Sequence, residues 1–200
     1  MLFSEILSTT TSSIMANAGL VKKVDLPLEV FPLASVGSAL FNFAVQCVVL
    51  IAGTIVLGGF PTGDRWLFFP LAVAVAVVWG LGIGFILSAL MVYLRDVQYL
   101  VEIALTVGFW LSPIVYLFGM VRDATGGHPW IEQIYLANPV TASIIGFHQT
   151  FWVAGDTTPN NVVPENLGLR LLVMLVLGLV FVLAGQRIFQ RLSGNFAQEL

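Results

Sequence analysis

The stretch Trp66–Leu94, WLFFPLAVAVAVVWGLGIGFILSALMVYL, decides the fold class because it is long, apolar and free of charged residues. An α-helix rises ~1.5 Å per residue and needs ~20 such residues to cross the ~30 Å hydrocarbon core of a membrane. Three further stretches meet this requirement: Phe31–Leu57, Tyr99–Met120 and Leu167–Phe189. The sequence therefore predicts an all-α, polytopic membrane protein with four complete transmembrane helices.

Composition supports this class, and the charge pattern gives an orientation. The chain has 58% hydrophobic and 10% charged residues, with a mean hydropathy of +0.95. Its net charge of −3 excludes a basic nucleic-acid-binding surface. With four crossings, one side of the membrane carries Lys22, Lys23, Arg95, Arg187 and Arg191, and the other carries Arg65, Arg122 and Arg170. The positive-inside rule then predicts a multi-pass protein of the cytoplasmic membrane with both termini of this chain inside.

Two regions outside the four stretches have membrane-related patterns. The N-terminal Met1–Leu7 is apolar and predicts a partial helix, followed by a Ser/Thr-rich patch and a polar cytoplasmic connector. Between the third and fourth stretches, a turn over Asp123–His128 precedes the apolar segment Pro129–Trp152, which Asn138-Pro139 interrupts. A proline at the centre makes a single spanning helix unfavourable. We therefore predict an outer re-entrant pair of short helices, followed by a turn over Gly155–Glu165.

Polar and small residues inside the first two stretches follow helical spacing. One polar stripe consists of Ser35, Ser38, Asn42 and Gln46. It has two interpretations of equal weight, hydrogen bonding between helices and the wall of a hydrated path. Gly80, Gly84 and Ser88 form a small-xxx-small pattern, which predicts close helix packing.

The third stretch contains the segment Phe109–Tyr116, FWLSPIVY, in which Pro113 should bend the helix. Its aromatic side chains are consistent with anchoring at the membrane interface or with stacking on sugar rings. Glu102 lies near the cytoplasmic start of the same stretch, where structural pairing is a better interpretation than a proton relay.

Catalytic and metal-binding motifs are missing from the sequence. There is no Gly-x-x-x-x-Gly-Lys-Ser/Thr, and Lys22 and Lys23 are the only lysines, so this chain has no P-loop. His128 and His148 lack metal-ligand spacing. The acids are scattered, which argues against a membrane-embedded glycosyl or phosphoryl transferase. We expect this chain to bind no cofactor or metal and to have no catalytic residue.

Several motifs occur in order along nearly the whole chain: NAGLVKKV with its following Pro and Glu residues from Asn17 to Leu33, YLRDV at Tyr93–Val97, FWLSPIVY at Phe109–Tyr116, LANP at Leu136–Pro139, and FAQEL at Phe196–Leu200. Together they resemble the permease subunit of type-2 ABC exporters. The branch that it is most similar to exports lipid-linked polysaccharides such as O-antigen or teichoic acid. The resemblance implies a homodimer of permeases with two copies of a separate ABC ATPase, which binds ATP and Mg²⁺. A permease of the same fold for a drug or a lipid is the alternative.

The resemblance also implies roles for particular residues. The ATPase-coupling residues would be Asn17, Leu20, Val21, Lys22, Lys23, Asp25, Glu29, Arg95 and Asp96. The translocation path would include Ser38, Asn42, Gln46, Phe109, Trp110, Ser112, Pro113 and Tyr116. The outer gate would include Asn138 and Pro139.

Family members typically have six spans and an amphipathic helix before the first span. Residues 1–200 resemble a single transmembrane permease domain that begins near the end of the second span. We therefore expect the natural reading frame to extend upstream of Met1.

Overall fold

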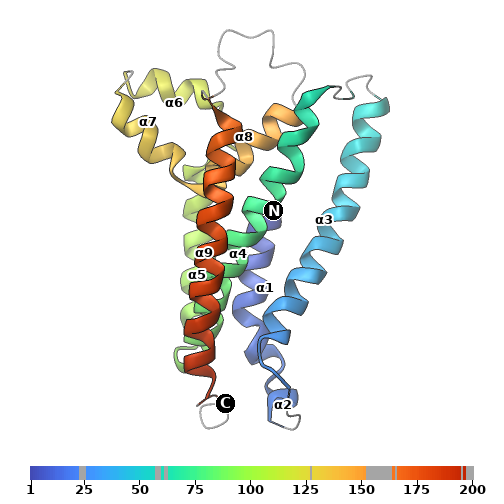
Figure 1. Ribbon diagram of the computed structural model, residues 1–200, viewed down its shortest axis with the longest axis vertical. Coiled ribbons are helices and arrows are strands. Elements are labelled where there is room, and N and C mark those ends of the chain that lie inside the picture. The colour runs from blue at the N-terminus through green and yellow to red at the C-terminus, as the bar shows by residue number, and fades with distance from the viewer. Residues whose placement is uncertain are drawn as a thin grey trace. The chain divides into compact units, whose positions relative to one another are not determined.

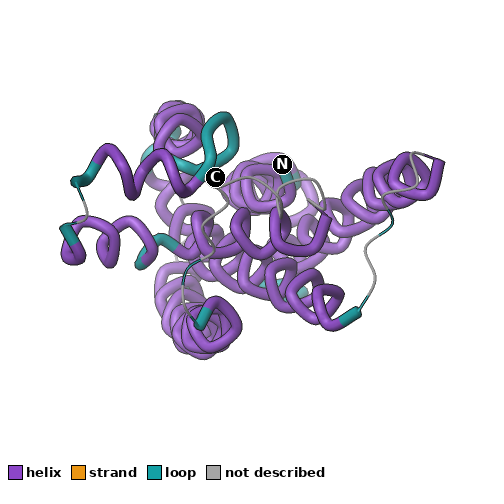
Figure 2. The backbone as a smooth tube through the Cα atoms, turned by 90° about the horizontal axis from the view of Figure 1, so that it is seen from above, coloured by secondary structure: helices purple, strands orange, loops and turns teal. Residues whose placement is uncertain are grey.

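The computed structural model describes residues 1–22, 26–56, 60, 63–126, 128–151, 164, 166–194 and 196. Within them every regular element is a helix, as Figure 2 shows. The α-helices are α1 Leu2–Ala16, α2 Ala18–Val21, α3 Val30–Val56, α4 Phe68–Tyr93, α5 Val97–Leu111, α6 Phe118–Ala124, α7 Pro129–Leu136, α8 Pro139–Phe151 and α9 Leu167–Ser193, and a 3₁₀ helix, η1, covers Asp64–Leu67 (Figure 1). The all-α fold class is therefore confirmed for the part of the chain that the structure describes.

The chain divides into two compact units that share its long helices. Unit 1 comprises Met1–Val45, Val77–Thr106 and Leu177–Leu200. Unit 2 comprises Gln46–Ala76 and Val107–Val176. The two sets of basic residues that the charge pattern separated also separate between the units, with Arg95, Arg187 and Arg191 in unit 1 and Arg65, Arg122 and Arg170 in unit 2.

The expected number of complete transmembrane helices is confirmed only in part. Among the described residues, three helices are long and apolar enough to cross a membrane: Val30–Val56, Asp64–Tyr93 and Leu167–Ser193. The expected helix over Tyr99–Met120 does not form as one element, because α5 ends at Leu111 and the chain turns before α6. Pro113 has no N–H to continue the helical ladder, and the N–H of Ile114 instead bonds the carbonyl of Ser112 at 2.7 Å. The proline therefore ends the helix rather than bending it.

A partial N-terminal helix forms, but the expectation that it stops at Leu7 and is followed by a polar connector is wrong, because α1 continues to Ala16 through the Ser/Thr-rich patch. The hydroxyls donate hydrogen bonds to carbonyls one turn earlier, as in Thr9 to Glu5 at 2.7 Å and Thr11 to Leu7 at 2.6 Å. These local bonds satisfy the hydroxyls within the helix. The patch is thus part of α1 and not of a connector.

Unit 1 is held together by close packing of α4 against α1 and α9. A Cβ atom placed on Gly84 would lie 2.6 Å from Cγ2 of Thr10 in α1, so the small-xxx-small prediction is confirmed. On the α9 side, a Cβ on Gly185 would lie only 2.5 Å from the carbonyl oxygen of Gly82. One apolar cluster joins these helices, with the buried residues Ile14, Phe85, Ala89, Val92, Phe189 and Phe196.

Unit 2 has an aromatic core where η1, α4 and α8 meet. Trp66 packs edge-on against Phe69 and Phe151 with ring centroids 5.9 and 5.8 Å apart. Phe147 makes a similar contact with Phe69 at 5.6 Å. Such edge-to-face pairs add specific geometry to apolar burial. They fix α8 against the start of α4.

The predicted interruption of the Pro129–Trp152 segment is confirmed. α7 ends at Leu136, α8 begins at Pro139, and Oδ1 of Asn138 accepts the N–H of Val140 at 3.0 Å. This bond caps the start of α8, where the first N–H groups have no partner inside the helix. A short turn joins the second and third apolar stretches, since α4 ends at Tyr93 and α5 begins at Val97. The turn expected over Gly155–Glu165 lies, apart from Pro164, outside the described residues.

Candidate functional site

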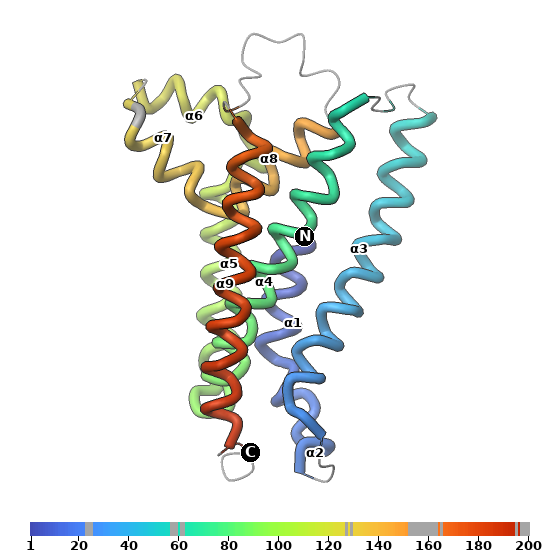
Figure 3. Tube along the Cα trace, viewed as in Figure 1, coloured from blue at the N-terminus to red at the C-terminus, as the bar shows by residue number. Residues whose placement is uncertain are grey.

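The predicted coupling residues that the structure describes all belong to unit 1. α2, the α4–α5 turn and the C-terminal end of α9 lie at the same end of this unit (Figure 3). Leu20 is 53% exposed and Lys22 is exposed, so both are available to a partner. Lys23 and Asp25 lie outside the described residues. This end of unit 1 is the candidate coupling surface.

Three predicted coupling residues have contacts inside unit 1. The side-chain amide of Asn17 donates to the carbonyl of Ser13 at 2.8 Å and thus helps to end α1. Val21 packs against the buried apolar cluster. Glu29 accepts a hydrogen bond from Nε2 of Gln190 in α9, with 2.7 Å between Oε1 and Nε2. Asn17, Val21 and Glu29 are therefore held by contacts within unit 1, whereas the side chain of Leu20 is exposed and available to a partner.

Arg95 and Asp96 occupy the turn between α4 and α5, and both side chains are exposed. The carbonyl of Asp96 accepts the N–H groups of Tyr99 and Leu100 at 3.1 and 3.3 Å, which starts α5. The turn therefore offers one positive and one negative side chain at the same end of unit 1 as α2.

The polar stripe on α3 makes hydrogen bonds to α1. Oγ of Ser35 lies 3.0 Å from Oγ1 of Thr10, and Nδ2 of Asn42 donates to Oε1 of Glu5 at 2.6 Å. At these two positions the structure supports the first interpretation of the stripe, hydrogen bonding between helices. The exposed residues Ser38 and Gln46 belong to different units.

α5 carries an exposed carboxylate, Glu102, on a face that it shares with Gln98 and the exposed Thr106. Glu102 is exposed, and its Oε1 accepts a hydrogen bond from Nε2 of Gln98 at 3.3 Å. The exposed neighbours on this helix include Leu100 and Ile103. A carboxylate within an apolar segment is costly to place against lipid. The face that carries Glu102 therefore needs water or protein in front of it, and its pairing with Gln98 agrees with the structural interpretation.

The predicted path residues of the third stretch surround the end of α5 in unit 2. Ser112 and Pro113 are buried, and Oγ of Ser112 donates to the carbonyl of Gly108 at 2.7 Å. The rings of Phe109 and Trp110 are exposed and lie perpendicular to each other with centroids 5.8 Å apart. This aromatic pair is the largest exposed feature of the path prediction.

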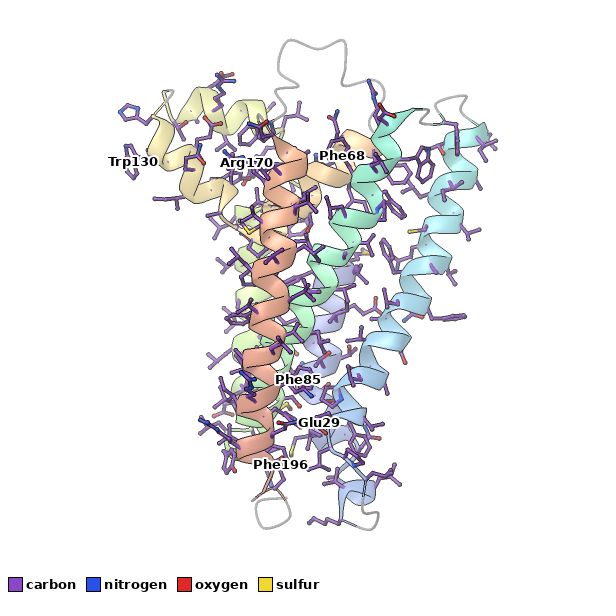
Figure 4. The ribbon with its side chains drawn as sticks, in the orientation of Figure 1. Glu29, Phe68, Phe85, Trp130, Arg170 and Phe196 are labelled. Carbon is purple, nitrogen blue, oxygen red and sulfur yellow. The ribbon has the colours of Figure 1, made fainter. Side chains whose placement is uncertain are left out.

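Tyr116 connects this turn to the outer helices. Its hydroxyl donates to the carbonyl of Trp110 at 3.3 Å and accepts the hydroxyl of Tyr135 in α7 at 3.2 Å. Burial, together with the hydrogen bond to Tyr116, raises the pKa of Tyr135, so this hydroxyl stays protonated and donates. α7 has a second polar contact, from the guanidinium of Arg170 in α9 to Oε1 of Gln133 at 3.0 Å. Figure 4 shows Trp130 projecting outward from this part of unit 2.

The predicted gate residues Asn138 and Pro139 are half-buried at the junction of α7 and α8. The cap described above fixes the direction in which α8 leaves the junction. Among the described residues no group of three or more His, Cys, Asp or Glu side chains could hold a metal ion. The arrangement is suited to binding partners and to movement of helices.

Two residues that sequence reasoning passed over have the strongest connections to the coupling surface. They are Gln190, which pairs with Glu29, and Phe196, which is fully buried in the apolar cluster of unit 1. The only signal for Phe196 was its place in the terminal FAQEL motif. Gln190 has no local pattern that distinguishes it from other polar residues of α9.

Comparison with known proteins agrees with the membrane architecture. The sequence model of the family described as "ABC-2 type transporter" matches residues 1–152. A protein of Klebsiella pneumoniae named "O-antigen export system permease protein RfbA" is 26% identical over 199 residues, which cover 99% of this chain and 70% of the relative. A protein of the same name from Myxococcus xanthus is 25% identical over 201 residues, covering 99% and 71% of the two chains. A further Klebsiella pneumoniae protein of this name is 24% identical over 198 residues, with 99% and 70% covered.

Proposed function

The chain belongs to the ABC-2 type transporter family, and from this we propose that it is the permease of an ATP-driven exporter for a lipid-linked polysaccharide. It is a transport subunit and not an enzyme. The observation that carries the substrate class is the similarity to O-antigen export permeases over 99% of this chain. The cargo would be a polyprenyl-linked cell-envelope glycan, such as an O-antigen or a teichoic acid, and the site of action would be the cytoplasmic membrane.

In this proposal the energy comes from ATP hydrolysis on a separate ABC ATPase, which docks on the candidate coupling surface. The exposed Leu20 offers an apolar anchor, and Lys22, Arg95 and Asp96 offer charged contacts at the same end of unit 1 (Figure 3). A small apolar anchor within a polar rim is the usual composition of a specific protein interface. ATP-dependent closure of the ATPase would shift the permease between two states through this surface. From the positive-inside rule we expect the surface and both ends of this chain to face the cytoplasm.

The functional assembly would contain two permeases and two ATPases, with the path between the permeases. Support comes from the exposed face of α5, where the polar groups of Glu102 and Thr106 favour a polar neighbour over lipid. A second copy of the chain, with water between the copies, provides one. Gln46, Phe109 and Trp110 are the exposed side chains that we assign to the path. Planar aromatic rings of this kind can stack on sugar rings, as a glycan path requires. α7 and α8, joined at Asn138-Pro139, would form the outer gate.

The alternative is a permease of the same fold that moves a drug or a lipid. The observation in favour of this alternative is the apolar character of the exposed faces of α3 and α5. Complementation of a strain that lacks the permease distinguishes a glycan exporter from a drug or lipid exporter. Expression of this chain together with its ATPase should restore surface glycan, and unchanged surface glycan alongside restored drug or lipid efflux would support the alternative.

Leu20→Asp tests the coupling surface. A charge at an apolar anchor costs several kcal/mol of binding free energy when it is buried. The ATPase should therefore no longer co-purify, and surface glycan should fall to the level of the deletion strain. Leu67→Asp is the matched control, because Leu67 is also exposed but belongs to unit 2, and this variant should retain the ATPase. Normal co-purification with Leu20→Asp would contradict the docking assignment.

A further inference from the structure

We propose that Gln190 and Phe196 form a clamp that holds one part of the coupling surface, α2 and its connector to α3, against α4 and α9. Its two contact residues are Phe196, which fills the apolar cluster of unit 1, and Gln190, which bonds Glu29. Both are positioning residues, since they act on the coupling surface and not on the glycan or on ATP. The inference rests on the proposed function and adds the part of the permease that receives movement from the ATPase.

Phe196 lies beyond the end of α9 and returns to the buried cluster. It is fully buried, and its ring contacts Phe189 of α9 and Tyr93 of α4 with centroids 5.6 and 6.1 Å apart. The hydroxyl of Tyr93 donates to the carbonyl of Leu192 at 2.9 Å, which ties the end of α4 to the end of α9. A buried aromatic ring has a large apolar area and a fixed geometry. Phe196 thus closes one end of the cluster.

The segment from α2 to the start of α3 contacts the same cluster. Val21 of α2, Leu28 of the connector and Phe31 at the start of α3 all pack against it. Ile14 brings the end of α1 into the same group of side chains. Every described helix end that borders the connector between α2 and α3 therefore touches the cluster that contains Phe196.

The pair Gln190–Glu29 adds a directional contact at the edge of this cluster. The donor is a side-chain amide of α9, and the acceptor is a carboxylate oxygen at 2.7 Å. Figure 4 shows Glu29 and Phe196 at the same end of unit 1. A hydrogen bond to a charged acceptor is stronger than one between neutral groups. Glu29 is thereby directed toward α9, whereas Leu20 on the same segment is open to a partner.

α9 can transmit movement of the coupling surface because the C-terminal half of α9 is fixed to α4. The close approach at Gly82 and Gly185 leaves no room for a side chain, and the rings of Trp79 and Phe181 stack with centroids 5.3 Å apart. Packed interiors transmit strain and shift between discrete arrangements instead of deforming gradually. A push on the coupling surface must therefore move α9 and α4 with it or break the clamp.

The polarity of the Gln190–Glu29 pair gives a test that leaves the buried cluster intact. Gln190→Glu places two carboxylates at this contact. The proposal expects the purified complex of permease and ATPase to export about three- to tenfold less glycan per ATP hydrolysed, in line with the loss of one hydrogen bond. ATPase co-purification should stay at the wild-type level, and the apparent melting temperature should fall by no more than the loss of one hydrogen bond explains. Adding Glu29→Gln to Gln190→Glu restores one amide donor and one carboxylate acceptor, and should recover most of the export.

The outcomes separate this inference from the proposed function. If the wild-type complex exports no glycan, the proposed function fails first. If the wild type exports but Gln190→Glu has the wild-type ratio of glycan to ATP, or if the double variant stays as low as Gln190→Glu alone, the clamp is refuted.

A second arm addresses Phe196. Phe196→Leu retains much of the apolar volume, whereas Phe196→Ala leaves a cavity. The proposal expects the ratio of exported glycan to hydrolysed ATP to decrease from the wild type through leucine to alanine, while the ATPase still co-purifies. An alanine variant that is well folded and exports at the wild-type ratio would refute the role of Phe196.

Discussion

Gly185→Ala is the sharpest test of how unit 1 is packed. The new Cβ would lie 2.5 Å from the carbonyl oxygen of Gly82, whereas ordinary van der Waals contact begins at 3.4 Å. The backbone would have to move by roughly 0.9 Å, the difference between these two distances. The obstacle is a backbone carbonyl and not the flexible end of a side chain, so the helices themselves must separate.

The cost of this separation can be estimated. A gap of 0.5–1 Å forfeits about a quarter to a half of the dispersion attraction between facing atoms, and overpacking substitutions typically cost about 1–3 kcal/mol. Trp79–Phe181 and Phe85–Phe189 are ring pairs on either side of the contact, so both would weaken. Replacing glycine by alanine also favours a helix by up to about 1 kcal/mol. That gain must be removed by a control before the packing cost is visible.

Gly37→Ala provides the control, because Gly37 lies in α3 of the same unit and has nothing within 4 Å of its Cβ position. The helix-propensity gain is common to both variants and cancels in their difference. We expect the unfolding free energy of Gly185→Ala to be about 2 kcal/mol below that of Gly37→Ala. For a chain of this size that corresponds to an apparent melting temperature about 4–8 °C lower.

Thermal unfolding of the purified protein in detergent, followed by tryptophan fluorescence at one fixed scan rate, measures this difference. A fixed rate is needed because unfolding of a membrane protein in detergent is often irreversible. If Gly185→Ala melts at or above the temperature of Gly37→Ala, α4 and α9 do not approach each other as the structure describes.

Three further predictions concern unit 2. Asn138→Ala removes the side-chain cap of α8 and should cost about 1 kcal/mol in thermal unfolding, whereas Asn138→Asp keeps an acceptor oxygen and should cost less. Tyr135→Phe removes the hydroxyl donor between α7 and the turn after α5, and should lower the unfolding free energy by about 0.5–1.5 kcal/mol. In a Cys47→Ala background, cysteine at the exposed position of Trp110 should react with a small water-soluble thiol reagent, and cysteine at the buried position of Val75 should not. Equal protection of both would contradict a hydrated path at the end of α5.

Sequence patterns predicted the elements whose cause is local. The break at Asn138-Pro139 follows from the geometry of proline, and the small-xxx-small pattern around Gly84 follows from side-chain size. Length and hydropathy identified the three long helices that the structure describes. Each of these features depends on a few neighbouring residues, so it can be recognised without knowing what packs against them.

The two corrected elements also have local causes, but opposing signals obscured them. In α1 the Ser/Thr run suggested a connector, because these residues often favour turns over helix interiors, yet their hydroxyls bond carbonyls of the same helix. In the third stretch, hydropathy continued past Pro113 to Met120, and the apolar residues after the proline concealed the end of α5 at Leu111. Hydropathy reports where a segment can lie and not whether its backbone is continuous.

Other features of the candidate site depend on contacts that no local pattern contains. Glu29 is separated from Gln190 by 161 positions, and Phe196 belongs to a cluster with residues from α1, α4 and α9. From the sequence alone, Leu20 and Val21 are equivalent apolar coupling residues. The structure distinguishes them, since Leu20 is exposed while Val21 packs on the cluster. An anchor must be exposed before binding, whereas a clamp contact must be buried. The tertiary fold therefore determines which residues of this short segment can contact the ATPase and which can pass the movement of the ATPase on to α9.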